Sequence, residues 1–424
     1  MNKYSATKSN LARKILHHGE KICKGEKRPV FKLICDVMFG LMAGQSCKLS
    51  EIARSLHEKT SLKKTIERLS LGLKNFGNIE VLQANHVRAV KKHIKSDTPL
   101  IIDGGDVTKP YGEKFEDLCH VRDGSTGEIE KGYWSMGCVA LTEQKLPIAV
   151  YDKLYSTKSH DFMSENAEIF KALDFLDEHF EKTNIRAFDR GFDRGKIFEK
   201  LIKTSVDFIV RLEETRNLIY KGKSINVLKL TNRFKGKCVL ECGSKKDKTY
   251  CKVSIIPVKL PKFPNVELSL VMCYGFGKKP MMLLTSLPKN SDKIGVTLVK
   301  VYLMRWRIEE FYRLKKVQFG FEDFRVRNLV AIQNLSIILN FSLSLLAILG
   351  DKAKESIMVA DLIEWSRRIY RELAGFCLYA IADGIKRATA HCETGIWRAT
   401  RKRHYDSQIC LFNWNLFGID CKIA

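Results

Sequence analysis

Two aspartates in this chain directly follow short apolar runs that are typical of buried strands. Asp103 ends the run PLIID, and Asp189 ends the run IRAFD. A third acidic residue, Glu309, lies in the helix-like segment VYLMRWRIEEFYRLKK. Hard divalent cations prefer carboxylate oxygens as ligands, and three clustered carboxylates stay ionised together only when positive charges lie near them. The three acids therefore predict a site that binds two metal ions and transfers a phosphoryl group.

Glu309 belongs to a pattern of four residues on one helix that we expect to span residues 291–318. Tyr302, Arg305, Glu309 and Lys316 are separated by three, four and seven positions, which places them on one helical face. Such a face can hold a metal ion through its carboxylate and a phosphate through its cationic and phenolic groups. The alternative is an ordinary surface helix in which arginine and glutamate form ion pairs.

The first acid of the site has two candidates. Asp103 ends the apolar run, and Asp106 follows three positions later. Residues three apart on a strand face opposite sides of the sheet, so at most one of them can meet Asp189. We favour Asp103 because it comes directly after the buried run. Asp193 is a weaker alternative to Asp189, because it falls on the helix expected to follow.

The elements that must position these acids alternate between strands and helices. From Pro99 onward the pattern predicts the order β-β-β-α-β-α-β, with a hairpin first and strand–helix units after it. An antiparallel hairpin followed by such units makes a mixed sheet with helices on its faces. The predicted fold class is therefore α/β, with an RNase H-like core, a β-rich insertion, and helical regions at both ends.

We expect five segments along the chain, each defined by a change in pattern or composition. They are a helical DNA-binding domain at 1–96, the first part of the core at 97–212, the β-rich insertion at 213–289, the second part of the core at 290–326, and a C-terminal helical region at 327–424.

Residues 49–73 have the pattern of a helix-turn-helix. The second helix would expose Lys63, Lys64 and Arg68 to DNA, while Leu62, Ile66 and Leu69 pack inward. The alternative is a helical hairpin with a solvated basic face.

The basic runs at 244–248 and 397–405 are expected to contact phosphates or to be solvated surface.

The charge of the whole chain favours a polyanionic partner. The 424 residues include 73 Lys or Arg and 48 Asp or Glu, which gives a net charge of +25. This excess costs self-repulsion unless phosphates neutralise it, so nucleic acid is the expected partner. A hydrophobic share of 45% excludes a disordered polyelectrolyte.

Two further features concern the cellular compartment. Thirteen scattered cysteines and no signal peptide predict reduced thiols in the cytoplasm. The uncharged run at 329–350 contains several Asn, Gln and Ser residues and has no second run of its kind after it. We therefore expect a buried core helix and no membrane insertion.

These motifs together resemble the DDE transposases of bacterial insertion sequences that carry a Tyr-Arg-Glu-Lys signature. Besides the four signature positions, the resemblance rests on RWRIEEF around Glu309, on the carboxylate–arginine pair in FDRG, and on Arg211 at the end of FIVR. It covers about residues 99–327. The resemblance implies DNA strand cleavage and strand transfer.

The resemblance also implies roles for individual residues. Asp103, Asp189 and Glu309 would be the catalytic acids and would hold two Mg²⁺ ions, for which Mn²⁺ could substitute. The residues expected to contact the DNA are Tyr302, Arg305, Lys316, Arg211 and Trp306. The implied partners are the terminal inverted repeats and the target, both double-stranded DNA, with a homodimer on that DNA in the bacterial cytoplasm at the nucleoid.

One departure from the family concerns a DNA hairpin intermediate. In part of the family an aromatic residue of the β insertion, typically Trp, stacks on a flipped base while the hairpin forms. All five tryptophans of this chain lie outside 213–289. The candidates to replace it are Tyr220, Phe234, Tyr250 and Phe276.

The alternative functions are a metal-dependent nuclease of the same fold without strand transfer, and a catalytically silent DNA-binding protein that descends from a transposase.

Overall fold

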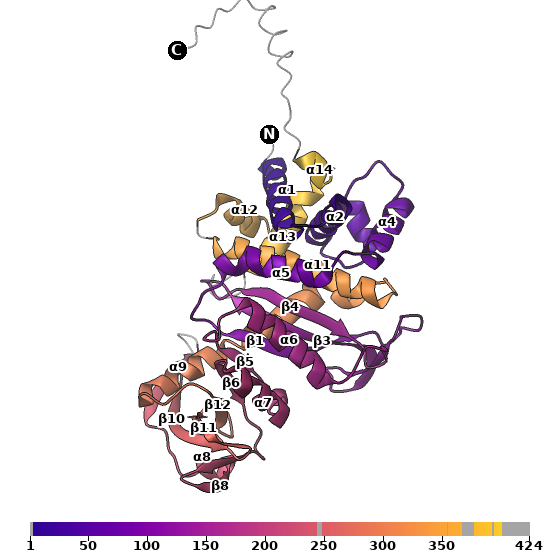
Figure 1. Cartoon of the computed structure of the whole chain (residues 1–424). Helices are drawn as coiled ribbons and strands as arrows, with labels where there is room; N and C mark the ends of the chain where they lie inside the picture. The colour runs from indigo at the N-terminus through magenta and orange to yellow at the C-terminus, as the bar shows by residue number, and fades with distance from the viewer. Residues whose placement is uncertain (1–2, 244–247, 354, 367–376, 392–393, 401–424) are drawn as a thin grey trace, which may run out of the picture.

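A mixed β-sheet runs through the molecule, with the N-terminal and C-terminal helices together at one end and the β-rich insertion at the other (Figure 1). The computed structural model describes residues 3–243, 248–353, 355–366, 377–391 and 394–400. The core strands are β1 (Leu100–Thr108), β3 (Ile129–Leu141), β4 (Pro147–Tyr155), β5 (Arg186–Phe188) and β6 (Phe208–Arg211).

The pairing of these strands is that of an RNase H-like fold. β1, β3 and β4 form an antiparallel unit, and β5 pairs parallel with β1 and with β6. The short strand β2 (Cys119–Arg122) lies along β3. The helices α6 (Glu165–His179) and α7 (Gly195–Thr204) connect β4 to β5 and β5 to β6. The strand and helix order predicted from the apolar pattern is confirmed except for β2, which the prediction did not include.

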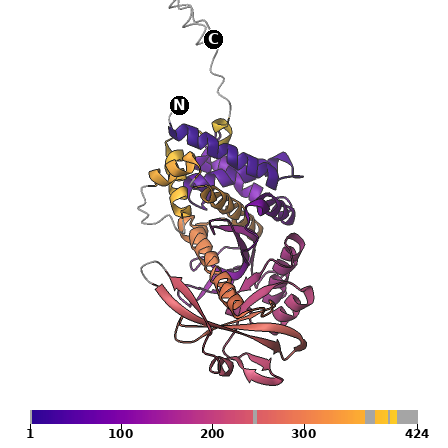
Figure 2. The same cartoon turned by 90° about the vertical axis from the view of Figure 1, so that its left-hand side faces the viewer.

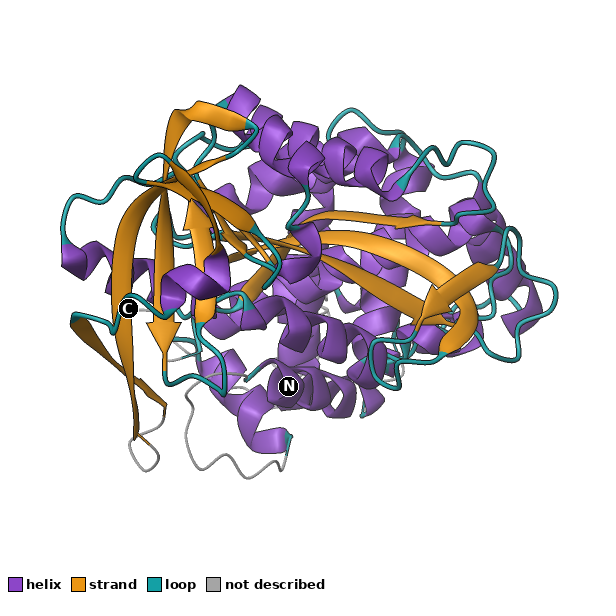
Figure 3. Ribbon diagram, turned by 90° about the horizontal axis from the view of Figure 1, so that it is seen from below, coloured by secondary structure: helices purple, strands orange, loops and turns teal. Residues whose placement is uncertain are grey.

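The β-rich insertion continues the same sheet. β12 (Met281–Thr285) pairs antiparallel with β6 and thereby joins the insertion to the core. The other insertion elements are β7 (Asn217–Tyr220), β8 (Lys223–Asn226), α8 (Val227–Thr231), β9 (Cys238–Gly243), β10 (Lys248–Leu260) and β11 (Phe263–Tyr274). The strands of the core and of the insertion can be followed in Figure 3. The predicted domain boundaries remain predictions.

The N-terminal and C-terminal helices pack against each other on the side of β4. The N-terminal helices are α1 (Lys3–Ile22), α2 (Arg28–Gly44), α3 (Leu49–Ser55), α4 (Leu62–Lys74) and α5 (Ile79–Val90), followed by the short turn η1 (Lys91–His93). The described C-terminal helices are α11 (Leu329–Asp351), α12 (Ile357–Trp365), α13 (Leu378–Ala390) and α14 (Ile396–Ala399). Figure 2 shows the indigo and yellow ends of the chain side by side. The remaining 401–424 of the predicted C-terminal region lies outside the described residues.

The uncharged run forms the core helix α11, which packs on β4. Among the described residues, α11 is the one single helix long and apolar enough to cross a membrane, and 89% of its most hydrophobic window is buried inside the protein. The pair α2 and α3 passes the same length and composition test, but it is bent by 95°. The expected burial of 329–350 is confirmed.

The prediction of a single helix over 291–318 is wrong. The structure has α9 (Asp292–Leu303), a tight turn, α10 (Trp306–Arg313), and the π-helical turn η3 (Leu314–Gln318). At the break the backbone amide of Arg305 bonds to the carbonyl of Tyr302, three residues earlier. At the end of η3 the amide of Phe319 bonds to the carbonyl of Leu314, five residues earlier. Both irregularities change the direction of the side chains that follow, so the spacing of a regular helix does not apply.

Candidate active site

The side chain of Arg305 joins two of the three predicted acids. One guanidinium nitrogen lies 3.0 Å from a carboxylate oxygen of Asp103, and another lies 2.5 Å from a carboxylate oxygen of Glu309. Arg305 and Asp103 are largely buried, while the side chain of Glu309 is 41% exposed. α10 therefore places its acid beside β1 through a shared cation.

Asp189 lies next to Asp103 because their strands are neighbours. β1 and β5 run parallel with Ile102 opposite Phe188, and each aspartate is the next residue. The carboxylate of Asp189 also accepts a hydrogen bond of 2.8 Å from the amide of Gly191. The parallel register thus brings together the acids that the sequence placed at two strand ends.

The electrostatics of Asp103 reflect this clustering. Burial raises the pKa of Asp103 to about 7, the negative charges of Asp189 and Glu309 add to the rise, and Arg305 opposes it. Like charges disfavour ionisation of a buried carboxyl group, whereas a nearby cation favours it. The site therefore holds more negative charge than Arg305 alone offsets.

The donor set suits a hard divalent cation in its chemistry, because it consists of carboxylate oxygens. In the arrangement seen here, no three His, Cys, Asp or Glu side chains of the described chain are grouped closely enough to hold a metal ion. The Arg305 guanidinium stands between Asp103 and Glu309 in that arrangement. These acids can share a metal ion only if Arg305 or Glu309 moves.

Tyr302 and Arg211 belong to the same neighbourhood. Burial raises the pKa of Tyr302. The positive charges of Arg305 and Arg211 oppose this rise, and the negative charge of Asp189 adds to it. Tyr302 is 4% exposed, and its ring packs in the hydrophobic cluster that α9 forms with the insertion. Trp306 is 65% exposed, and its ring centre lies 5.9 Å from the guanidinium carbon of Arg305. The site therefore has an exposed aromatic rim.

Lys316 does not share the face of Arg305 and Glu309, which corrects the single-face expectation. Its ammonium lies 2.7 Å from Asp106 and 3.1 Å from Glu322. Burial lowers the pKa of Lys316, but the two carboxylates outweigh this and raise it. The π-helical turn displaces Lys316 from the stripe. The structure thus pairs Asp106 with Lys316, and Asp103 with Arg305.

Asp193 takes part in a separate ion pair. Its side chain is fully buried, lies 2.5 Å from a guanidinium nitrogen of Arg216, and accepts a 2.7 Å hydrogen bond from the amide of Glu213. This pair fastens the start of the insertion to the loop after β5. Asp193 is therefore occupied away from Asp103.

Sequence reasoning missed Tyr312. This side chain is one turn beyond Glu309, and its hydroxyl donates a 3.0 Å hydrogen bond to the backbone carbonyl of Asp103. A Cβ atom at Gly137 would lie 2.4 Å from that hydroxyl, so only glycine leaves room for it. The pattern Glu-x-x-Tyr on the predicted helix was the available signal.

A buried ion pair supports η3 from behind. The ammonium of Lys315 lies 3.3 Å from both carboxylate oxygens of Asp152 on β4 and 2.8 Å from the hydroxyl of Ser336 on α11. Lys315 and Asp152 are both almost completely buried. The turn that carries Lys316 is thereby fixed to the core.

The structure places the predicted DNA-contacting residues of the N-terminal domain on α4. Lys63 and Lys64 are exposed, whereas Arg68 pairs with Asp36 at 3.0 Å and with Glu58 at 2.9 Å. Leu69 is buried, but Leu62 is 39% exposed and does not pack inward as expected. Leu62 is the first residue of α4, where the helix still projects into solvent.

Of the aromatic residues of the insertion, Tyr250 is 61% exposed and Phe276 is 49% exposed. Tyr220 and Phe234 pack edge to face with ring centres 5.9 Å apart. Residues 244–247 and 401–405 of the two basic runs lie outside the described part of the chain.

Comparison with known proteins adds one family. Residues 137–345 match the model of the transposase DDE domain. A solved structure that resembles the whole chain is a piggyBac transposase synaptic complex with hairpin DNA, at 9% identity and a TM-score of 0.47, with 98% of this chain and 84% of that chain covered. No curated protein matches the sequence. The matched stretch begins after Asp103, includes Asp189 and Glu309, and ends within α11. Residues 137–345 are therefore similar to a transposase DDE domain.

Proposed function

We propose that this protein is the transposase of a bacterial insertion sequence, of the kind that carries the Tyr-Arg-Glu-Lys signature, and that it cleaves and joins DNA strands. The observation that carries the proposal is the meeting of Asp103, Asp189 and Glu309 from β1, the end of β5 and α10. The three acids come from separate segments of the chain, and their mutual repulsion is unfavourable unless a cation lies between them.

The catalytic residues in this proposal are Asp103, Asp189 and Glu309, with Asp103 preferred over Asp106 because it is the aspartate beside Arg305 and Glu309. The three would hold two Mg²⁺ ions, or Mn²⁺ in their place. When bound, such ions activate an attacking water or 3′-hydroxyl and stabilise the leaving oxygen. Arg305 balances the carboxylates and would exchange this contact for the substrate phosphate.

The groups around the acids would hold the DNA. Arg211, Tyr302 and Arg305 are proposed to orient the phosphate that is cut, and exposed Trp306 to pack against a nucleotide next to it. Lys316 would contact the backbone beside the cut after it leaves Asp106. Lys63, Lys64 and Arg68 of the N-terminal domain are proposed to contact the transposon end.

The proposed partners are double-stranded DNA of the terminal inverted repeats and of the target. A net charge of +25 supports a polyanionic partner. Because two ends must be handled together, we propose a homodimer on the DNA. The proposed location is the bacterial cytoplasm, at the nucleoid, without membrane association.

The test uses the full chain, Mg²⁺, and a duplex that carries the sequences flanking the gene. Strand cleavage followed by joining of the cut end to a second duplex is the expected result. Cleavage without joining would instead identify a nuclease, and binding without cleavage would identify a silent DNA-binding protein. The variant Glu309→Gln, which should bind but not cleave, excludes a contaminating nuclease.

A further inference from the structure

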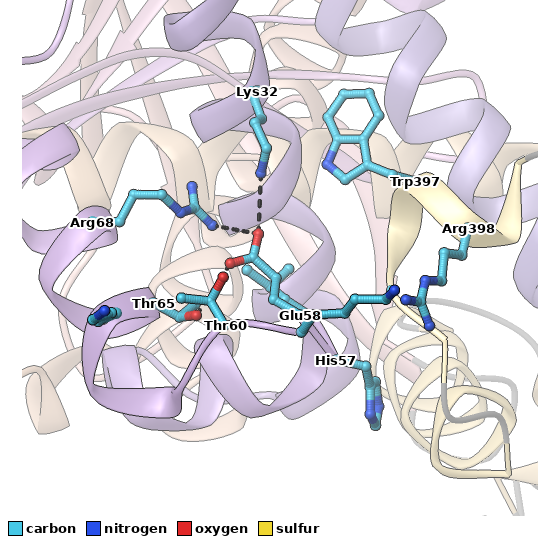
Figure 4. A pocket seen from close by; sticks show the side chains of 12 residues that line it. Lys32, His57, Glu58, Thr60, Thr65, Arg68, Trp397 and Arg398 are labelled. Atoms are coloured by element: carbon cyan, nitrogen blue, oxygen red, sulfur yellow. Dashed lines mark hydrogen bonds and ion pairs between the residues drawn. The ribbon is translucent and has the colours of Figure 1, made fainter.

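A pocket of about 370 Å³ lies far from the acids, between the N-terminal helices and α14 (Figure 4). Its walls are the turn between α3 and α4, the first turns of α4, Lys32 of α2, and the start of α14. Figure 4 shows Arg68 on one side, Trp397 and Arg398 on the other, and Glu58 between them. The pocket therefore joins two parts of the chain that are more than 300 residues apart.

Three of the residues that line the pocket are held by one buried acid behind them. Asp36 is fully buried and lies 2.5 Å from the ammonium of Lys32 and 3.0 Å from Arg68. The indole nitrogen of Trp397 donates a 2.7 Å hydrogen bond to the other oxygen of Asp36. α2, α4 and α14 are thus held together by a single carboxylate. Charge-assisted bonds of this kind keep a site in place before any ligand arrives.

Close backbone packing also brings α14 to this place. A Cβ atom at Gly395 would lie 2.0 Å from the carbonyl oxygen of Leu56, at the end of α3. Only glycine permits this approach, so the residue before α14 determines how near Arg398 comes to the turn after α3. The wall of the pocket that α14 forms therefore depends on glycine at position 395.

The side chains of the pocket carry an excess of positive charge. Lys32 and Arg68 are matched by Asp36 and Glu58, with Glu58 at 3.2 Å from Lys32 and 2.9 Å from Arg68. Lys59, Lys64 and Arg398 also line the pocket and are exposed. These last three form no ion pair with any residue that the structure describes.

The count of formal charges is five cations, Lys32, Lys59, Lys64, Arg68 and Arg398, against two acids, Asp36 and Glu58, which leaves +3. In addition, α4 begins at this pocket and has no acidic residue in its first turn. The N-terminus of a helix carries a partial positive charge and free amide groups that favour an anion. Both contributions have the same sign.

We propose that this pocket binds a single phosphate of the DNA backbone, held by Lys59 and Lys64 from the helix-turn-helix and by Arg398 from α14. This inference rests on the proposed function insofar as the protein binds DNA. A phosphate contact positions the duplex without reading its sequence. Lys64 is therefore assigned to the backbone, and α14 is part of the DNA-binding surface although it lies at the opposite end of the chain.

The test measures how the DNA binding constant of the full chain depends on salt, with a duplex of arbitrary sequence and without Mg²⁺. The triple variant Lys59→Gln, Lys64→Gln, Arg398→Gln should bind more weakly. For B-DNA the slope of log K against log salt becomes steeper by about 0.9 for each phosphate that the protein neutralises, because counterions are released. One shared phosphate predicts a loss of about 0.9, whereas three separate contacts would remove about 2.7. A loss near the larger value, or none, overturns the proposal.

Two further arms separate the possible explanations. Lys352→Gln removes an exposed lysine at the end of α11, outside the pocket, and should leave the slope unchanged. Gly395→Ala should make the slope less steep, as the triple variant does. The added methyl group forces α14 away from Leu56 and moves Arg398 with it. Tight binding of inorganic phosphate to the wild type, with an unchanged slope in the triple variant, would identify a free-phosphate site instead. A wild type that binds no duplex at all contradicts the proposed function itself.

Discussion

The hydroxyl of Tyr312 donates a hydrogen bond to the backbone carbonyl of Asp103 across the interface between α10 and β1. The bond is 3.0 Å long, and the tyrosine ring lies against Gly105 and Gly137, where larger residues would displace it. The helix that carries Glu309 is therefore held to the strand that carries Asp103 by a residue that presents no charge. The distance between these two acids depends on this contact.

The variant Tyr312→Phe should slow strand cleavage without weakening DNA binding. It removes only the hydroxyl, leaves the carbonyl of Asp103 without this partner, and should lower the free energy of unfolding by about 1 kcal/mol. We expect a roughly tenfold slower cleavage rate, equivalent to about 1.4 kcal/mol. Measured single-turnover rates and DNA dissociation constants check this. Tyr111→Phe is the control, since Tyr111 is 96% exposed, and equal rates for both variants would refute the positioning role.

Replacing Glu309 by Gln should abolish cleavage and preserve binding. The amide keeps the shape of the side chain but loses the charge that would hold a metal ion, so a fall of at least about a hundredfold is expected. Glu310→Gln is a matched control on the same helix, because Glu310 pairs with Arg313 at 3.4 Å, whereas Glu309 pairs with Arg305. Cleavage by the Glu309 variant at the wild-type rate would rule out the active-site assignment.

Lys316 distinguishes a structural ion pair from a DNA contact. In Lys316→Ala the carboxylates of Asp106 and Glu322 lose their cation, and the proposed backbone contact is also lost. If Lys316 binds DNA, the slope of log K against log salt should become less steep by about 0.9. An unchanged slope together with reduced stability would show that Lys316 serves only to pair with Asp106. Lys300→Ala, which changes an exposed lysine of α9, provides the comparison.

Acid should destabilise the packing of the N-terminal helices on the core. His18 and His86 are buried with ring centres 5.4 Å apart, and burial lowers the pKa of His86 from 6.5 to about 4. Because the unfolded chain then binds more protons than the folded chain, stability falls as the pH drops from about 6.5 towards 4. For His86 alone the loss at pH 5 is about 2 kcal/mol.

Urea unfolding at pH 7.5 and pH 5 measures this effect. His86→Gln should show a smaller difference between the two pH values than the wild type, because glutamine does not titrate in this range. His160→Gln, at an exposed histidine, should behave like the wild type. A pH difference of the same size in the His86 variant would assign the acid sensitivity to other groups.

The order of elements and the positions of the acids followed from local pattern. The runs LII before Asp103 and RAF before Asp189 are short and apolar, as in buried strands. The acids that follow them lie close together because parallel strands place equivalent ends at one edge of the sheet. Periodicity acts over a few residues, so the sequence alone determined the RNase H-like order, the helical termini, and Asp103, Asp189 and Glu309 as the candidate acids.

Tertiary structure decided which partner each charged group meets. Arg305 lies 202 positions from Asp103 and Lys316 lies 210 from Asp106, and no local pattern selects between such pairs. A break after Leu303 and a π-helical turn after Arg313 separate Lys316 from the stripe that regular spacing predicts. The junction of α14 with the turn after α3 likewise depends on the packing at Gly395 and Leu56, because residues so far apart in the chain come together only when the whole core is assembled.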